Sequence, residues 1–157
     1  MTDCYSCRQN AIDAAQLPPR EAVYDDGLWR VAHAFTAALL GWMVVVVRRH
    51  LTSASQLTPE EAAALGPLLS RLSTAIEAET GASKCYVIFL AEAPGFEHLQ
   101  IHVIPRLPDM PPDRIGIEAM KYLAQPESQW VRVEDMDKIS ASIHARIANP
   151  RHSTEVA

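Results

Sequence analysis

The chain has 157 residues, enough for one domain with its own hydrophobic core and short for two. Its composition, 48% hydrophobic and 21% charged, is that of a globular protein and argues against a fibrous or disordered chain. The net charge of −5 argues against a nucleic-acid backbone as the main partner, because binding to phosphates depends on an excess of Lys and Arg.

Two strands are predicted in the first third of the chain. Residues 28–33 alternate weakly in polarity after the turn sequence Asp25-Asp26-Gly27, which favours a strand. Residues 42–48 are rich in β-branched side chains and follow Gly41, which predicts a second strand, buried on both faces.

A long helix is predicted to begin after Thr58. Thr58 can serve as N-cap, Pro59 suits the first helical position and Glu61 completes a capping box. Apolar residues then recur at helical spacing, at Leu65, Leu69, Leu72 and Ile76. Gly81 is expected to end the helix, and Gly66-Pro67 is expected to bend or interrupt its first turns.

Two further strands are predicted in the middle of the chain. Residues 84–90 are rich in β-formers, with Cys85 as a small buried hydrophobe among them. A turn over residues 93–97 then returns the chain into a strand over residues 98–104. Because a short turn joins the two strands, we expect them to be antiparallel neighbours.

The last part of the chain predicts irregular structure followed by a helix. The prolines that follow Pro105, at positions 108, 111 and 112, exclude a continued central strand. Glu134-Asp135 mark a helix start, and the apolar stripe that follows is Met136, Ile139, Ile143 and Ile147. We therefore predict an α+β domain over residues 1–149, with an antiparallel sheet, one long central helix and a C-terminal helix, and a flexible tail over residues 150–157.

The strand over residues 98–104 carries polar side chains at alternate positions. His98, Gln100 and His102 are expected to share one face, because successive side chains of a strand point to opposite faces. The apolar residues between them are expected to face the core; they are Leu99, Ile101 and Val103. The sequence thus predicts that three polar groups open into one cavity. The alternative is a half-exposed strand that happens to carry histidines.

The chain shows no membrane or export signal. Its longest apolar run is far shorter than the roughly 20 residues that span a bilayer, and the first residues lack the layout of a signal peptide. We therefore expect a cytoplasmic protein that binds neither a membrane nor nucleic acid. In a reducing compartment, three cysteines indicate metal or redox chemistry rather than a structural disulfide.

Two cysteines near the N-terminus have the spacing of a metal-binding pair. Cys4 and Cys7 are separated by two residues, which lets both thiolates reach one tetrahedral ion. His50 and His98 are candidates to complete the site, and Zn²⁺ readily accepts two sulfur and two nitrogen ligands. Redox pairs share this spacing, and a further alternative is that the cysteines belong to a mobile N-terminus.

The order of these motifs resembles the histidine triad superfamily of nucleotide hydrolases and transferases, in its zinc-containing bacterial-type branch. The matching segments are Cys4-x-x-Cys7, Gly41 before the strand that ends Arg48-Arg49-His50, Leu57-Thr58-Pro59-Glu60-Glu61, and His98-x-x-x-His102-Val103-Ile104-Pro105-Arg106. The resemblance covers residues 4–107 and implies a histidine-triad-like fold and a homodimer. It also implies a structural Zn²⁺ whose ligands are Cys4, Cys7, His50 and His98.

The chain departs from that family at the expected active site. Gln100 stands where the family has its nucleophilic histidine, and an amide nitrogen is no nucleophile because its lone pair is delocalised into the carbonyl. Pro94 and Gly95 replace the polar residues that many members place before the triad, and Ala34 lies near the position of a ribose-binding Asp or Asn. These departures weaken the inheritance of the usual substrate.

Two other residues retain candidate chemistry. His102 could contact a phosphate or act as a general acid with a near-neutral pKa, and Arg106 could supply positive charge. The alternatives are a hydrogen-bonded sheet histidine and a solvated loop arginine. His33 and His144 follow no pattern and are interpreted as surface or satisfied histidines, and the tryptophans as core or interface residues.

The resemblance implies a site that binds a nucleotide or another phosphorylated small molecule. If the ligand is hydrolysed, we expect direct attack by water without a histidyl intermediate, with Gln100 and His102 as the catalytic residues. The expected ligand-binding residues are His98, Gln100, His102 and Arg106. The alternatives are a zinc-stabilised, non-catalytic binding or interaction module that has lost nucleotidyl transfer, and a pocket remodelled for other chemistry.

Overall fold

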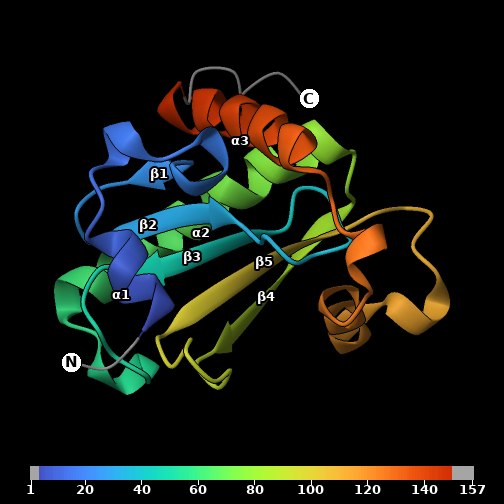
Figure 1. The fold of residues 1–157 in the computed structure, drawn as a ribbon. Coiled ribbons are helices and arrows are strands. Elements are labelled where there is room, and N and C mark those ends of the chain that lie inside the picture. Colours follow the sequence, from blue (N-terminus) through green and yellow to red (C-terminus); the bar gives the residue numbers. More distant parts are fainter. Residues whose placement is uncertain (1–3, 150–157) are drawn as a thin grey trace.

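The computed structural model describes residues 4–149, in which five antiparallel strands form one sheet (Figure 1). The strands are β1 (Tyr24–Asp25), β2 (Trp29–His33), β3 (Met43–Val47), β4 (Lys84–Leu90) and β5 (Gln100–Arg106). Across the sheet their order is β1-β2-β3-β5-β4, so β3 and β5 lie inside it and β4 forms an edge. The predicted tail at 150–157 lies outside the described residues.

Three α-helices and several short 3₁₀ turns complete the described chain. The α-helices are α1 (Tyr5–Asn10), α2 (Pro59–Thr80) and α3 (Val133–Ala148). The 3₁₀ turns are η1 (Ala14–Gln16), η2 (Pro19–Glu21), η3 (Ala54–Gln56), η4 (Pro112–Arg114), η5 (Gly116–Leu123) and η6 (Glu127–Gln129). The predicted α+β architecture, with an antiparallel sheet, a long helix and a C-terminal helix, is confirmed.

The two faces of the sheet are covered by different elements: the long helices α2 and α3 pack on one face, and α1 and several 3₁₀ turns lie on the other. Behind the sheet, α2 packs against β4 and β5, and α3 packs against α2 and β2 (Figure 1). On the opposite face, α1 lies at one end and the 3₁₀ turns η4 to η6 lie at the other (Figure 1). The alternation predicted for β5 is observed, because Ile101 and Val103 are fully buried in the core beneath the helices.

The sequence signals at the ends of α2 are confirmed. Of the two effects expected at Gly66-Pro67, a bend or an interruption, the interruption is wrong and the bend stays a prediction. Thr58 Oγ1 accepts a hydrogen bond from Glu61 N, Glu61 Oε2 accepts one from Thr58 N, and Gly81 follows the helix with a left-handed φ of 72°. The helix continues through Pro67. Pro67 has no backbone N–H, so the carbonyl of Ala63, four residues earlier, receives no hydrogen bond within the helix. Both residues are exposed, so water can hydrogen-bond to that carbonyl oxygen.

The strand predicted over residues 98–104 begins and ends two residues later, at Gln100 and Arg106. Residues 98 and 99 precede the ladder because β3 ends at Val47, and Leu99 N donates instead to the carbonyl of Leu51, in the loop beyond β3. The shift matters for His98, which the sequence placed on the strand.

The edge strand β4 leaves two large apolar side chains exposed. Val87 is 41% and Phe89 is 42% exposed, and both lie on the face of the strand that looks toward α2. The homodimer expected from the resemblance stays a prediction, as does the absence of nucleic-acid binding. None of the helices in residues 4–149 combines the length and the apolar character that a bilayer span requires.

Replacing Gly41 by Ala is expected to destabilise the fold more than the same change at Gly27. Both glycines have a left-handed φ, of 85° and 84°, which costs an alanine about 1 kcal/mol or more. A Cβ at Gly41 would lie 2.6 Å from Thr80 Cγ2, at the end of α2, whereas a Cβ at Gly27 would meet nothing within 4 Å. The clash should add about 1–3 kcal/mol. Urea denaturation measures the free energy of unfolding of both variants. Equal losses of stability would contradict the proposed clash between a Cβ at Gly41 and Thr80.

Candidate functional site

A cluster of two cysteines and two histidines joins α1 to the sheet. Cys4 is the N-cap of α1, Cys7 lies within the helix, His50 follows β3 and His98 precedes β5. Their candidate ligand atoms all lie within 4.8 Å of one another. The structure therefore brings together the four residues that the resemblance nominated as metal ligands, from three separate parts of the chain.

The distances within this cluster fit a tetrahedral ion. The Sγ atom of Cys7 lies 3.3 Å from Nδ1 of His50 and 3.5 Å from Nδ1 of His98, and Cys4 Sγ is also 3.5 Å from His98 Nδ1. A tetrahedral zinc ion, with Zn–S near 2.3 Å and Zn–N near 2.0 Å, places sulfur and nitrogen about 3.5 Å apart. The donor set and its spacing thus match the ion.

A backbone hydrogen bond orients His98 toward the cysteines. Its Nε2 lies 2.7 Å from the carbonyl oxygen of Val47, which can only accept, so Nε2 carries the proton and Nδ1 keeps its lone pair. This is the usual outer contact of a metal-ligating imidazole. Burial, then the neighbouring Cys4, raises the pKa of the Cys7 thiol to about 11, so an incoming metal ion must displace a proton there.

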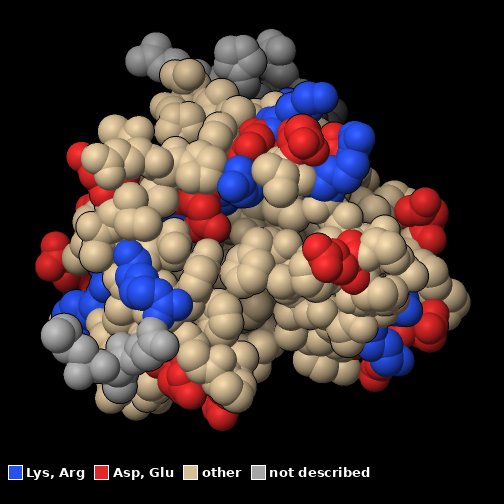
Figure 2. Space-filling model, in the orientation of Figure 1, with Lys and Arg blue, Asp and Glu red and all other residues tan. Residues whose placement is uncertain are grey.

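A cavity of about 460 Å³ opens on the face of the sheet opposite α2. Figure 2 shows a hollow in the middle of this face, with walls that are mainly neither acidic nor basic. Its described lining residues are Tyr5, Ser6, Glu21, Arg30, Ala32, His33, Ala34, Phe35, Thr36, Val44, Val46, Leu90, Glu92, Ala93, Phe96, Gln100, His102, Met120 and Leu123.

The predicted sharing of one cavity by three polar groups is only partly right. Gln100 and His102 line the cavity, whereas His98 belongs to the cysteine cluster. His98 turns away because it precedes the regular strand and its ring is held by the carbonyl of Val47. Arg106, the other expected ligand-binding residue, donates from Nη1 to the carbonyls of Leu107 and Pro108, and its role in binding stays a prediction.

His102 is held in one neutral form. The indole Nε1 of Trp42 donates to His102 Nδ1 at 3.0 Å, and because an indole can only donate, the imidazole proton must be on Nε2. Burial lowers the pKa of His102 to about 4. The near-neutral pKa expected of a general acid is therefore wrong, because the sequence did not reveal how deeply the side chain is buried. His102 offers the cavity a neutral N–H donor.

Gln100 presents an amide to the same cavity. Its Nε2 donates to the carbonyl of Phe96 at 3.2 Å, in the turn before β5. That contact orients the amide and leaves Oε1 as an acceptor for a ligand. Neither Gln100 nor His102 in this form is a nucleophile or a strong base.

A buried ion pair lines the cavity and was missed from the sequence. Arg30 is 2% exposed, its Nη1 lies 3.0 Å from Glu21 Oε2, and it also donates to the Glu21 carbonyl. Its Nε donates to Asn10 Oδ1, so α1 helps to hold it. The only available signal was an arginine on the expected first strand, whose partner in η2 has no characteristic spacing.

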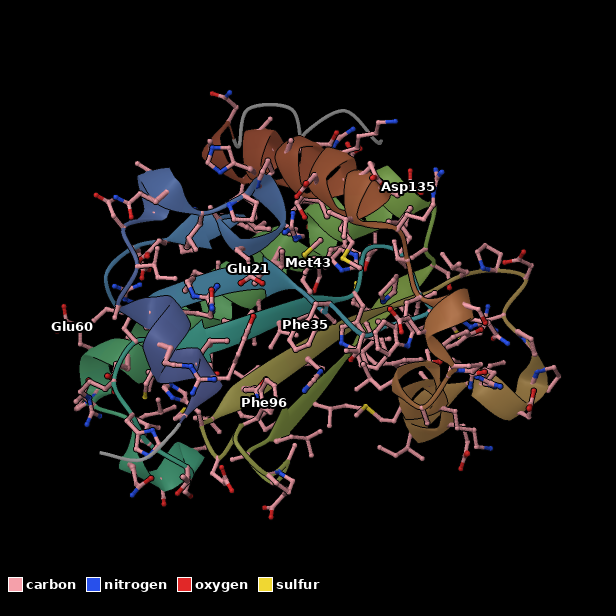
Figure 3. All side chains as sticks on the ribbon, in the orientation of Figure 1. Glu21, Phe35, Met43, Glu60, Phe96 and Asp135 are labelled. Carbon is pink, nitrogen blue, oxygen red and sulfur yellow. The ribbon has the colours of Figure 1, made fainter. Side chains whose placement is uncertain are left out.

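Three aromatic rings gather at the same cavity. Ring centroids of Tyr5 and Phe35 are 5.3 Å apart, those of Tyr5 and Phe96 are 5.0 Å apart, and those of Phe35 and Phe96 are 6.0 Å apart. Figure 3 shows Phe35 and Phe96 in front of the sheet, with Glu21 above them. We call these three rings the aromatic collar. They come from α1, the loop after β2 and the turn before β5. Because these segments are far apart in the sequence, no local pattern predicted that the three rings would meet.

The other two histidines of residues 4–149, His33 and His144, behave as the sequence suggested. His33 lies beside the cavity with Nδ1 donating to the carbonyl of Ala34 and Nε2 accepting from Gly41 N, so both nitrogens are satisfied. Burial lowers the pKa of His33 to about 4. His144 Nδ1 bonds the carbonyl of Val23.

Comparison with known proteins identifies the fold. No protein-family model matches the chain, and no curated protein sequence matches it. A hypothetical histidine triad nucleotide-binding protein from Sulfolobus tokodaii is 18% identical, with a TM-score of 0.67 over 94% of this chain and 96% of that chain. A zinc-bound histidine triad family protein from Mycobacterium smegmatis is 16% identical, with a TM-score of 0.64 over 95% and 96%.

A larger solved structure, a uridylyltransferase, is also similar. It is 18% identical with a TM-score of 0.62, and the match spans 92% of this chain but 45% of that chain. At identities this low the likeness shows the fold alone. This chain therefore has the fold of histidine triad proteins, as the order of its motifs predicted.

Replacing Trp42 by Phe is expected to let His102 populate both neutral tautomers. In the wild type, long-range ¹H–¹⁵N spectra of the histidine side chains should show His102 with its proton on Nε2 and a titration midpoint near pH 4. Trp42→Phe removes the donor to Nδ1, so both tautomers should become populated. Trp29→Phe is the matched control, because Trp29 is equally buried but donates to the carbonyl of Glu61. A proton on Nδ1 in the wild type would contradict the assignment.

Proposed function

We propose that the cavity binds a nucleotide or another phosphorylated small molecule without forming a covalent histidyl intermediate. The observation that carries this proposal is that Gln100 and His102 line the same cavity. Gln100 presents an amide and His102 presents a neutral N–H donor. The fold supports the ligand class, since similar structures include a histidine triad nucleotide-binding protein and a uridylyltransferase.

Binding without turnover is the function that this geometry supports best. Covalent catalysis needs a nucleophile at the middle triad position, and an amide cannot serve. Hydrolysis by direct attack of water is the second candidate, because Gln100 Oε1 and the Nε2–H of His102 can together position a water molecule and a phosphoryl oxygen. It is less favoured, since neither group is a base strong enough to activate water.

Gln100→His is expected to separate these possibilities. With adenosine 5′-phosphoramidate, the wild type should show thermal stabilisation, no adenylyl adduct by intact-protein mass spectrometry and no release of AMP. Gln100→His restores an imidazole at this position and should gain a detectable adduct, whereas Gln100→Asn, which keeps an amide, should not.

The outcomes of this experiment have distinct meanings. Release of AMP by the wild type without an adduct would favour water attack over binding alone. An adduct on a wild-type histidine would refute the proposal.

We also propose that Cys4, Cys7, His50 and His98 bind one structural Zn²⁺. The proposal is supported by the spacing of the four ligand atoms and by the hydrogen bond that orients His98. An ion bound here would cross-link α1 to the segments that flank β3 and β5, and would supply folding free energy rather than reactivity, because four protein ligands close its coordination shell.

Cys7→Ser is expected to lose the metal. Elemental analysis should find about one zinc per wild-type chain and much less in this variant, whose melting temperature should fall because a structural ion stabilises only the folded state. Cys85→Ser is the matched control, since Cys85 lies on β4 and bonds the carbonyl of Ser73. Equal zinc in wild type and Cys7→Ser would contradict the proposed ligand set.

A further inference from the structure

The wall of the cavity carries no net positive charge. Arg30 is the only lysine or arginine among its described lining residues, and Glu21 neutralises it at 3.0 Å. Glu92 adds an exposed carboxylate to the rim. The lining histidines are buried, and their pKa values of about 4 keep both neutral at physiological pH. A polyphosphate entering the cavity would meet no uncompensated cation.

The cavity offers a small set of hydrogen-bonding groups at fixed positions. His102 presents the N–H of Nε2, and Gln100 presents Oε1. In Arg30, Nε and Nη1 are occupied by Asn10 and Glu21, while Nη2 has no acceptor within residues 4–149. These groups can satisfy a few ligand oxygens and one ligand N–H, which is a modest polar content for a cavity of this size.

The register of the sheet spaces these groups across three strands. Arg30 pairs with Val46, and Val46 pairs with Gln100, so the three form one cross-strand row. Neighbouring strands lie about 4.8 Å apart, which puts Arg30 and Gln100 about 10 Å apart at their backbones. The floor between them is apolar, because Val44 and Val46 fill the central strand. A ligand that uses both polar ends must therefore lay an apolar body across β3.

The aromatic collar favours a flat group at the mouth. Tyr5, Phe35 and Phe96 present tilted rings to one another at centroid separations of 5.0 to 6.0 Å, and Phe35 is 41% exposed. A planar ligand that packs against these rings would bury aromatic surface that the free protein leaves in water.

We propose that this cavity selects a flat ligand that is uncharged or carries a single negative charge, such as a nucleoside or a nucleoside with one singly ionised phosphoryl group, and discriminates against nucleoside di- and triphosphates. The nucleoside part of this inference rests on the proposed function. The charge selection rests on the cavity wall alone, because burying several negative charges without a partner cation is strongly unfavourable.

The test compares matched ligands that differ in charge, by isothermal titration calorimetry of the full chain at pH 7.5. One series is adenosine, adenosine 5′-phosphoramidate and ATP, and the second is 1-naphthol and 1-naphthyl phosphate. In each series the less charged members should bind at least about tenfold more tightly than the most charged member. Tighter binding of ATP than of adenosine, or of naphthyl phosphate than of naphthol, would overturn the charge selection.

The two series separate this inference from the proposed function. Binding of naphthol but of no adenosine compound would refute a nucleotide-related function and leave the charge selection standing. Tighter binding of ATP than of adenosine would support the nucleotide function and refute the charge selection. If no compound of either series binds, both are refuted.

A variant that adds a cation gives an independent readout. Thr36 lines the cavity and is partly exposed, so Thr36→Lys can place an ammonium group at the rim. Relative to Thr36→Met, which has similar length and no charge, Thr36→Lys should raise the ratio of the naphthyl phosphate affinity to the naphthol affinity about three- to fivefold. If Thr36→Lys leaves phosphate binding unchanged, the missing cation does not limit the ligand and the inference fails.

Discussion

The carbonyl oxygen of Val47, at the end of β3, is the point on which both the cysteine cluster and the cavity depend. It accepts hydrogen bonds from His98 Nε2 at 2.7 Å and from Asn10 Nδ2 at 3.0 Å, which uses both of its lone pairs. The first bond turns Nδ1 of His98 toward the cysteines. The second fixes α1 so that Asn10 Oδ1 can accept from Arg30, inside the cavity wall. One strand end thus sets the geometry of two neighbouring sites.

The two sites share α1 and the start of β5 but do not share side chains. Cys7 faces the cluster while Tyr5 joins the aromatic collar, and His98 faces the cluster while Gln100 lines the cavity. A change at the cluster can therefore reach the cavity through the position of α1, although the four cluster side chains do not line the cavity. This separation makes the proposed structural metal compatible with the proposed binding role of the cavity.

Local signals were sufficient for α2, α3 and the strands β2 to β5, but not for α1 or β1, and tertiary contacts decided the site. The cap at Thr58 and the apolar stripe of α3 depend only on spacing, so both were predictable from the sequence. The alternation of β5 correctly placed Gln100 and His102 on one face, but the first residue of the ladder depends on where β3 ends, which spacing cannot reveal. The lowered pKa of His102 results from burial among distant segments, so no local pattern encodes it.

Phosphoryl transfer requires an attacking group and positive charge around the transferred phosphoryl group. This cavity departs from both requirements through different residues. Gln100 stands where the resemblance places the attacking histidine, while the pairing of Arg30 with Glu21 and the neutral state of His102 leave no uncompensated positive charge. Gln100 and His102 lie on β5, whereas Arg30 lies on β2 and Glu21 in η2. The features arise from separate contacts, so a single substitution does not account for them. Their agreement favours a cavity organised as a whole for holding a ligand of low charge over one that has simply lost a nucleophile.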